Sequence, residues 1–130
     1  MKDMKNNMDA QHSIIPAAAF TATTTGSSVD LKGFAGAMAV FNVGAADTGN
    51  ADETYIPGLE ESSDNSTFTA VAAADIEGDV STLLQNSVRR LGYKGNKRYI
   101  KAKITIGGTT PSVIAGGLIV RGRPESAPVA

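Results

Sequence analysis

The stretch Arg98-Tyr99-Ile100-Lys101-Ala102-Lys103-Ile104-Thr105-Ile106 decides the fold class of this chain. Between residues 100 and 106 every even-numbered residue is apolar, and the odd-numbered positions are polar or charged. Side chains alternate between the two faces of a β-strand, so a strand collects these apolar residues on one side, whereas a helix scatters them around its axis. The stretch therefore predicts a strand with one face in a core and the other in water.

Several segments on either side of this strand also have strand patterns. The run 37–43 is apolar at nearly every position, which is typical of a strand buried on both faces. Pro57 places its strand at a sheet edge or a bulge, because proline cannot donate to a strand ladder. Phe68 is expected to point into the core. The predicted strands are 29–34, 37–43, 55–61, 67–71 and 112–121.

Turn residues separate these segments. Residues 62–66, Ser-Ser-Asp-Asn-Ser, predict a hairpin connection, since Asp and Asn bond to the local backbone and tolerate the left-handed region. The paired Gly116 and Gly117 predict a bulge or a close backbone approach. Segment 80–91 fits two structures. Its apolar residues have helical spacing, with Ser81 as a possible cap, but it is short and flanked by strand-like segments.

Six to eight short strands with little helix predict an all-β fold, an antiparallel, jelly-roll-like β-sandwich with at most one short helix. We expect an extended N-terminal arm over residues 1–20, a sandwich domain over 21–124 and a C-terminal tail over 125–130. Residues 1–13 are polar and show no period. The arm is the candidate for reaching a neighbouring subunit, with Ile14, Ile15 and Phe20 as its apolar contacts.

The composition argues against several classes of protein. The chain has 130 residues, no cysteine and one histidine, His12, which excludes disulfides and Cys/His zinc sites. No segment combines a nucleophile, a base and oxyanion donors, so we expect no enzyme and no cofactor. The carboxylates at 64 and at 75–79 offer oxygens that calcium would accept, but neither matches an EF-hand loop and turn chemistry explains both, so we expect no metal. We also expect neither a membrane helix nor a secretory signal peptide.

Charge is divided along the chain. Residues 1–80 hold twelve acidic and three basic side chains, whereas residues 81–130 hold nine basic side chains and one acid, Glu125. One interpretation is that acidic and basic strands are neighbours within one sheet. The other is that the two halves meet a neighbouring copy or a capsid surface, since opposed charges steer association.

Most of the basic residues fall in a strip over residues 89–103, which we call the basic strip. The strip resembles a phosphate-binding surface with stacking platforms, but a sequence pI near 5.7 and the acidic half disfavour a nucleic-acid partner. We therefore place nucleic acid below a protein partner. The candidate contact residues in the strip are Arg89, Arg90, Tyr93, Lys94, Lys97, Arg98, Tyr99, Lys101 and Lys103.

Two stretches resemble the small virion proteins of tailed phages that are encoded beside the major capsid protein. Residues 59–78 resemble their L-E-x-S-D-D-G-(S/T)-x-(F/W)-x-x-V-x-x-A-D stretch, and residues 92–101 are similar to G-Y-x-G-x-(K/R)-R-Y-(V/I)-(R/K). Residues 120–124 match a closing V/L-x-G-x-P. The resemblance covers about residues 55–128 and departs at Asn65, where glycine is usual.

This resemblance implies a phage head protein with a β-sandwich or jelly-roll fold. We expect a capsid cement or decoration protein, a homo-oligomer and by analogy a trimer, which binds the major capsid protein outside the lattice. It would be a virion component assembled in the host cytoplasm. The alternative is a head–tail connector or minor tail protein. A third class, a host-glycan-binding β-sandwich, is disfavoured because the chain has no Trp and three Tyr.

Overall fold

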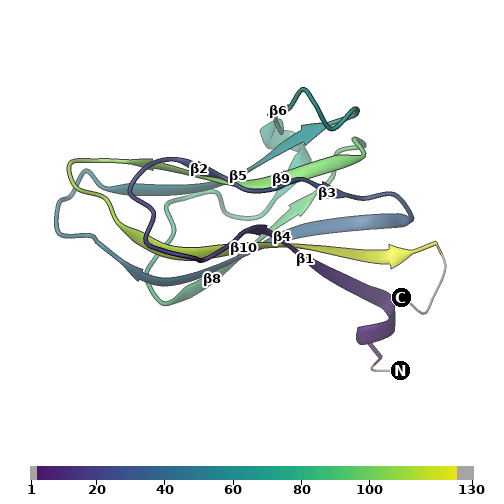
Figure 1. The fold of residues 1–130 in the computed structure, drawn as a ribbon, viewed down its shortest axis with the longest axis horizontal. Coiled ribbons are helices and arrows are strands. Elements are labelled where there is room, and N and C mark those ends of the chain that lie inside the picture. The colour runs from purple at the N-terminus through teal and green to yellow at the C-terminus, as the bar shows by residue number, and fades with distance from the viewer. Residues whose placement is uncertain (1–2, 126–130) are drawn as a thin grey trace.

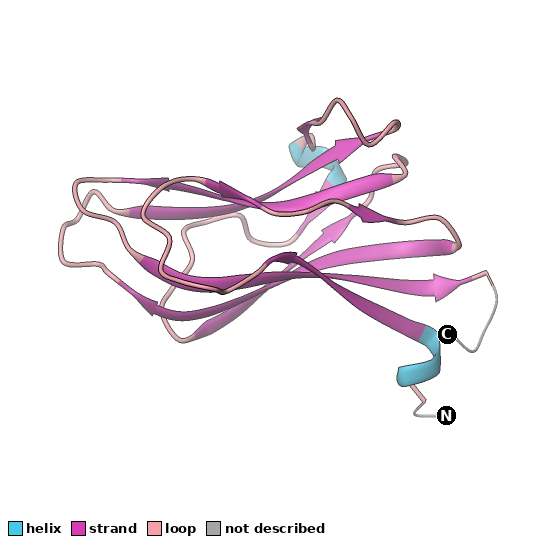
Figure 2. Cartoon of the chain, in the orientation of Figure 1, coloured by secondary structure: helices cyan, strands magenta, loops and turns pink. Residues whose placement is uncertain are grey.

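A computed structural model describes residues 3–125 of the chain (Figure 1). The described residues form strands and two 3-10 helices of three residues each (Figure 2). The elements, in chain order, are η1 Lys5–Asn7, β1 Met8–Ile14, β2 Thr24–Thr25, β3 Val29–Asp30, β4 Phe34–Ala46, β5 Thr54–Ser62, β6 Thr69–Ala70, η2 Ala73–Asp75, β7 Ile76–Glu77, β8 Ser87–Tyr93, β9 Tyr99–Gly107 and β10 Val113–Pro124.

The strands form two antiparallel sheets that pack face to face, so the predicted β-sandwich is confirmed. Sheet A has the strand order β1-β10-β4-β8-β7. Sheet B has the order β2-β9-β5-β6, with β3 also paired to β9. Figure 1 shows the two sheets as separate layers, with the start of β1 and the end of β10 at the same end of the molecule.

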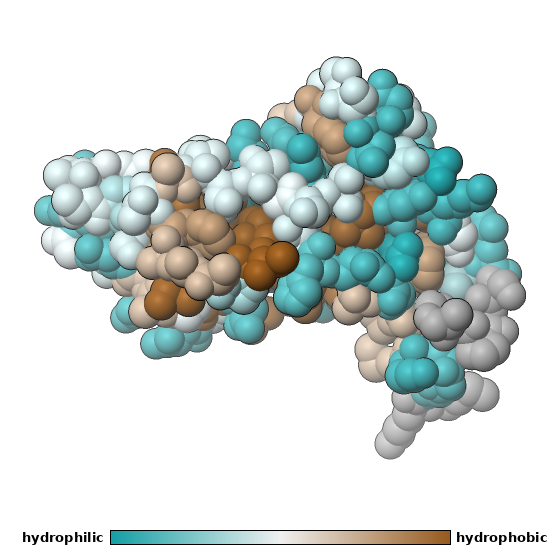
Figure 3. Space-filling view, in the orientation of Figure 1, coloured by the Kyte–Doolittle hydropathy of each residue, from teal (hydrophilic) through white to brown (hydrophobic). Residues whose placement is uncertain are grey.

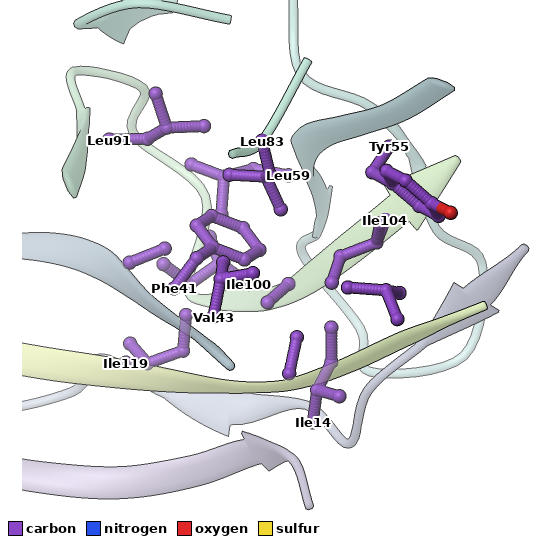
Figure 4. Close-up of a cluster of buried hydrophobic side chains, with 14 of the residues drawn as sticks. Ile14, Phe41, Val43, Tyr55, Leu59, Leu83, Leu91, Ile100, Ile104 and Ile119 are labelled. Carbon is purple, nitrogen blue, oxygen red and sulfur yellow. The ribbon is translucent and has the colours of Figure 1, made fainter. Parts of the chain in front are cut away.

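The core lies between the sheets and takes alternate residues from both (Figure 4). Phe41 and Ile119 come from sheet A, and Ile100 and Ile104 come from sheet B; all four are fully buried. The alternation in β9 therefore works as predicted, with Lys101 and Lys103 on the opposite face. Burying an aliphatic or aromatic side chain of this size contributes about 1.5–3 kcal/mol.

A buried tyrosine closes one end of the sandwich. Tyr55 is 1% exposed, and its hydroxyl lies 3.1 Å from the Ser112 carbonyl oxygen and 2.5 Å from the Asp47 carbonyl oxygen. The same hydroxyl accepts a hydrogen bond from the Ser112 amide at 3.0 Å. Burial, the largest cause, raises the pKa of the Tyr55 phenol. The ring thus fills the core while its oxygen fixes two loops.

Residues 8–14 correct the expectation of an N-terminal arm over residues 1–20. They form β1, which pairs with β10 from Met8, opposite Gly122, to Ile14, opposite Gly117. Ser13 is buried, donates to the Ser27 carbonyl oxygen at 2.7 Å and accepts from the Ala102 amide at 2.9 Å. Backbone pairing and this buried hydroxyl make β1 part of the sandwich, although Asp9 and Gln11 at its inward positions hide the strand period in the sequence.

One alternative left open by the sequence is now decided, and two further predictions were wrong. Segment 80–91 contains no helix, because residues 87–93 form β8 between β4 and β7. The predicted strand 29–34 is split by a turn at Gly33, whose φ of 88° separates β3 from β4. Phe68 lies on the outer face of sheet B, with the ammonium of Lys101 3.9 Å from its ring centroid. A cation above the ring thus replaces core packing there.

Other local predictions are confirmed. Asn65 has a φ of 59°, the left-handed conformation expected of the 62–66 connection. Pro57 lies in a part of β5 that pairs with β9 only, because β6 reaches no further than Glu60. A side chain at Gly117 would lie 3.2 Å from the Ala102 side chain of the other sheet, so the glycine permits close approach of the sheets.

Candidate functional site

The basic strip does not form one surface in the fold. Arg90 points to the outer face of sheet A, in register with Val40, whereas Lys101 and Lys103 point to the outer face of sheet B. These two faces look in opposite directions. Arg89 points toward the inner side of sheet A, where it donates to the Asp79 carbonyl oxygen at 2.6 Å and to the Ser81 carbonyl oxygen at 2.9 Å. The strip is therefore divided among a loop and several faces.

Ion pairs within the chain neutralise much of the strip. Every ion pair found within 4.0 Å among residues 3–125 joins an acid from the first 80 residues to a base from the last 50. The pairs are Asp79–Arg89, Glu77–Lys94, Asp30–Arg98, Glu60 with both Lys101 and Lys103, and Asp9–Arg121. The interpretation that acidic and basic strands are neighbours accounts for these contacts.

Tyr93 joins the two stretches that carry the phage resemblance. Its hydroxyl donates to Glu61 Oε1 at 2.7 Å and accepts from the Lys97 amide at 3.0 Å. Partial burial and the bond to Glu61 raise the pKa of Tyr93 to about 12. A Cβ at Gly95 would lie 2.5 Å from the Tyr93 ring, so only glycine fits there. The Gly-Tyr-x-Gly pattern thus builds a cross-sheet contact at this end of the sandwich.

A second contact at the same end joins β3 to the start of β9. Arg98 makes a two-pronged contact with the Asp30 carboxylate, with both nitrogen–oxygen distances at 2.8 Å. These bonds are the largest cause that lowers the pKa of Asp30 to about 2. The guanidinium also lies 5.1 Å from the Tyr99 ring centroid. Arg98 and Tyr99 are therefore engaged within the chain.

A hollow of about 370 Å³ opens beside Tyr93, and we call this region the Tyr93 end. Its walls are residues 31–33 of the β3–β4 turn, residues 34–37 at the start of β4, Tyr93 at the end of β8, residues 95–98 of the β8–β9 loop, and Glu125. Lys32 and Lys97 are exposed on its walls, and neither has a carboxylate within 4.0 Å among residues 3–125. Of the basic-strip candidates, Lys97 at the Tyr93 end and Arg90 on the outer face of sheet A thus remain available to a partner, and the turn adds Lys32 to the Tyr93 end.

The three apolar candidates near the N-terminus have different positions. Ile14 is 2% exposed and belongs to the core. Phe20 is half-buried against the core and its backbone pairs with Val113. Ile15 is 59% exposed at the start of the β1–β2 connection. Figure 3 shows brown and tan atoms gathered where this connection runs, and of the three candidates Ile15 is the exposed one.

The acidic turns are explained by backbone contacts. Asp64 Oδ1 accepts from the Ser66 amide at 2.9 Å and the Thr67 amide at 3.0 Å, which lower its pKa to about 2. Asp79 accepts from the Ser81 amide at 2.8 Å. Within residues 3–125 no group of three or more His, Cys, Asp or Glu side chains is arranged to hold a metal ion. No helix in the described part of the chain is long and apolar enough to cross a membrane.

The sequence did not predict two features of this site. The partner of Tyr93 is Glu61, 32 residues away, and Lys32 joins the hollow through the β3–β4 turn. The resemblance covered both Glu61 and Tyr93 but gave no contact between them. Comparison with protein-family models, with curated proteins and with solved structures found no match.

Proposed function

We propose that this protein is a structural virion protein of a tailed phage, a cement or decoration protein that binds the outside of the capsid lattice. The observation that supports the proposal is the contact between the two stretches that resemble phage proteins, residues 59–78 and 92–101. Glu61 and Tyr93 join them through a 2.7 Å hydrogen bond, and Glu60 pairs with Lys101. The residues that carry the resemblance thus support one another in a single structural unit.

The Tyr93 end is the proposed contact with the major capsid protein. Lys32 and Lys97 offer two cations beside a hollow, whereas the other cations of the loop, Lys94 and Arg98, contact Glu77 and Asp30. Such a surface suits an acidic patch on the shell. Because a protein that binds the assembled shell stabilises that state by mass action, many modest contacts suffice to reinforce a head.

The test is a count of copies on purified particles, together with a binding assay on heads that lack this chain. A cement protein occurs on the order of hundreds of copies over the lattice, whereas a connector occurs in about six or twelve at one vertex. Absence of the chain from particles would refute the virion role, and a low count at one vertex would replace it with the connector role.

A charge-matched pair of variants tests the contact surface. Lys32→Gln with Lys97→Gln removes two positive charges from the Tyr93 end. Thr54→Glu with Thr105→Glu changes the net charge by the same amount at two exposed sites in sheet B. We expect the first double variant to lose occupancy on heads and the second to keep it. Equal occupancy of both variants would exclude the Tyr93 end as the contact.

A further inference from the structure

Sheet A is apolar on both of its faces. In β4, Ala39, Phe41 and Val43 face the core, while Met38 and Val40 face outward. The outward residues lie in register with Leu118 and Val120 of β10, and beyond these with Ala10 of β1. Val88 of β8 continues the same face and is 65% exposed. The outer face of sheet A therefore has an apolar centre on β4 and β10, and the polar side chains of His12, Asn42 and Arg90 lie around this centre.

The outer face of sheet B has the opposite character. Glu60, Lys101, Lys103 and Thr105 occupy it, as expected of an antiparallel sheet with one face in water. A sheet that is apolar on both faces normally has cover on both faces. The 3-10 helices of the described chain, at three residues each, are too short to cover four strands. An apolar face of this extent marks an interaction surface.

We propose that the outer face of sheet A is covered by the same face of a second copy of this chain. The face favours an apolar partner because, within residues 3–125, Arg90 is the charged side chain that the four strands place on it, near its β8 side. An acidic or nucleic-acid partner would find almost no counter-charges there. The same face of a second copy is equally apolar and can therefore cover it. Two antiparallel sheets pack face to face at a spacing of about 10 Å.

The extent of the face is adequate for such a pair. The register shared by 37–43 and 87–93 gives seven residues, or about 23 Å of strand at roughly 3.4 Å per residue. Four strands at about 4.8 Å each give a width of roughly 19 Å. Two copies thus cover a flat footprint of roughly 900 Å² before side-chain relief is counted, which is the size of a small, weakly held interface.

Contact between identical faces gives a twofold pair, because each copy presents the same patch to the other. The trimer that the phage resemblance implies would require two different patches on each copy. The pairing is independent of the capsid role, so the two proposals fail separately: occupancy on heads tests one, and the mass of the free protein tests the other.

The experiment measures the mass of the full chain by light scattering and sedimentation. At about 100 µM we expect twice the 13.4 kDa of one chain. Val40→Lys puts a charge at the centre of the face. Val88→Lys puts a charge on β8, at a position exposed enough to tolerate lysine. Both are expected to raise the dimer dissociation constant at least tenfold, which is about 1.4 kcal/mol. Thr105→Lys, on the outer face of sheet B, is expected to leave it unchanged.

Circular dichroism and urea unfolding establish that each variant is folded. A wild-type monomer at this concentration would overturn the proposal, and so would a trimer. A dimer that persists in both Val40→Lys and Val88→Lys would also overturn it, because the contact would then lie elsewhere.

Discussion

Replacing Ser13 by alanine tests whether β1 belongs to the sandwich. Ser13 is 3% exposed, and its hydroxyl joins β1 to two other segments, through the Ser27 carbonyl at 2.7 Å and the Ala102 amide at 2.9 Å. Ser13→Ala removes both bonds and leaves the buried Ala102 amide and the part-buried Ser27 carbonyl without their partner. Each unsatisfied group costs about 1–3 kcal/mol. We therefore expect the free energy of unfolding to fall by about 2–4 kcal/mol, a large share of the roughly 5–15 kcal/mol typical of a domain.

Urea unfolding at pH 7, followed by circular dichroism, measures this loss as a shift of the midpoint at constant slope. Ser63→Ala is the matched control, because Ser63 is exposed in the 62–66 turn and should change stability by no more than about 0.5 kcal/mol. If Ser13→Ala and Ser63→Ala unfold at the same urea concentration, then residues 8–14 contribute little to the sandwich and the assignment of β1 is refuted.

Three further predictions concern the Tyr93 end. Tyr93→Phe removes a hydroxyl with two hydrogen bonds and should lower stability by about 1–3 kcal/mol in urea, whereas Tyr99→Phe should change it little; equal losses would contradict this. Gly95→Ala places a methyl group 2.5 Å from the Tyr93 ring and should cost about 1–3 kcal/mol; an unchanged melting temperature would contradict the packing. The pKa of Asp30 is about 2 in the folded chain and 3.8 ordinarily, so the stability that its carboxylate contributes is present above pH 3.8 and is lost as the pH falls toward 2. Asp30→Asn should flatten that part of the acid-unfolding curve, and an unchanged curve would exclude this role for Asp30.

The sequence predicts those strands in which one face is polar and the other apolar. In β9 and β5 the alternation and the turn residues around them locate the strands to within a residue or two. Segment 80–91 was ambiguous because Val88 and Leu91 satisfy helical spacing, while in the structure they lie on opposite faces of β8. The pairing of β8 with β4 decides its structure, and that pairing is not visible in local spacing.

The N-terminal strand was missed for a related reason. Along residues 8–12 the inward positions include Asp9, whose carboxylate pairs with Arg121 instead of joining the apolar core. An ion pair across 112 residues gives no local signal, so the segment has the composition of a tail. The candidate site was predicted only in part. Its motif was recognisable in the sequence, but the partners of Tyr93 and Arg98 come from strands far away in sequence, so the contacts were not.

The topology explains how a chain with separate acidic and basic halves gives two unlike outer faces. Acidic β5 lies beside basic β9, so Glu60 meets Lys101 and Lys103 and the charges of sheet B oppose one another on its outer face. The central strands of sheet A, β4 and β10, contribute almost no charge to its outer face, because Arg121 of β10 points inward to Asp9. Exposed ion pairs add little stability, about 0–1 kcal/mol each, so their arrangement matters more for contact than for folding. The two outer faces therefore differ because the pairing of β5 with β9 gathers opposite charges on sheet B, whereas β4 and β10 leave the centre of sheet A apolar.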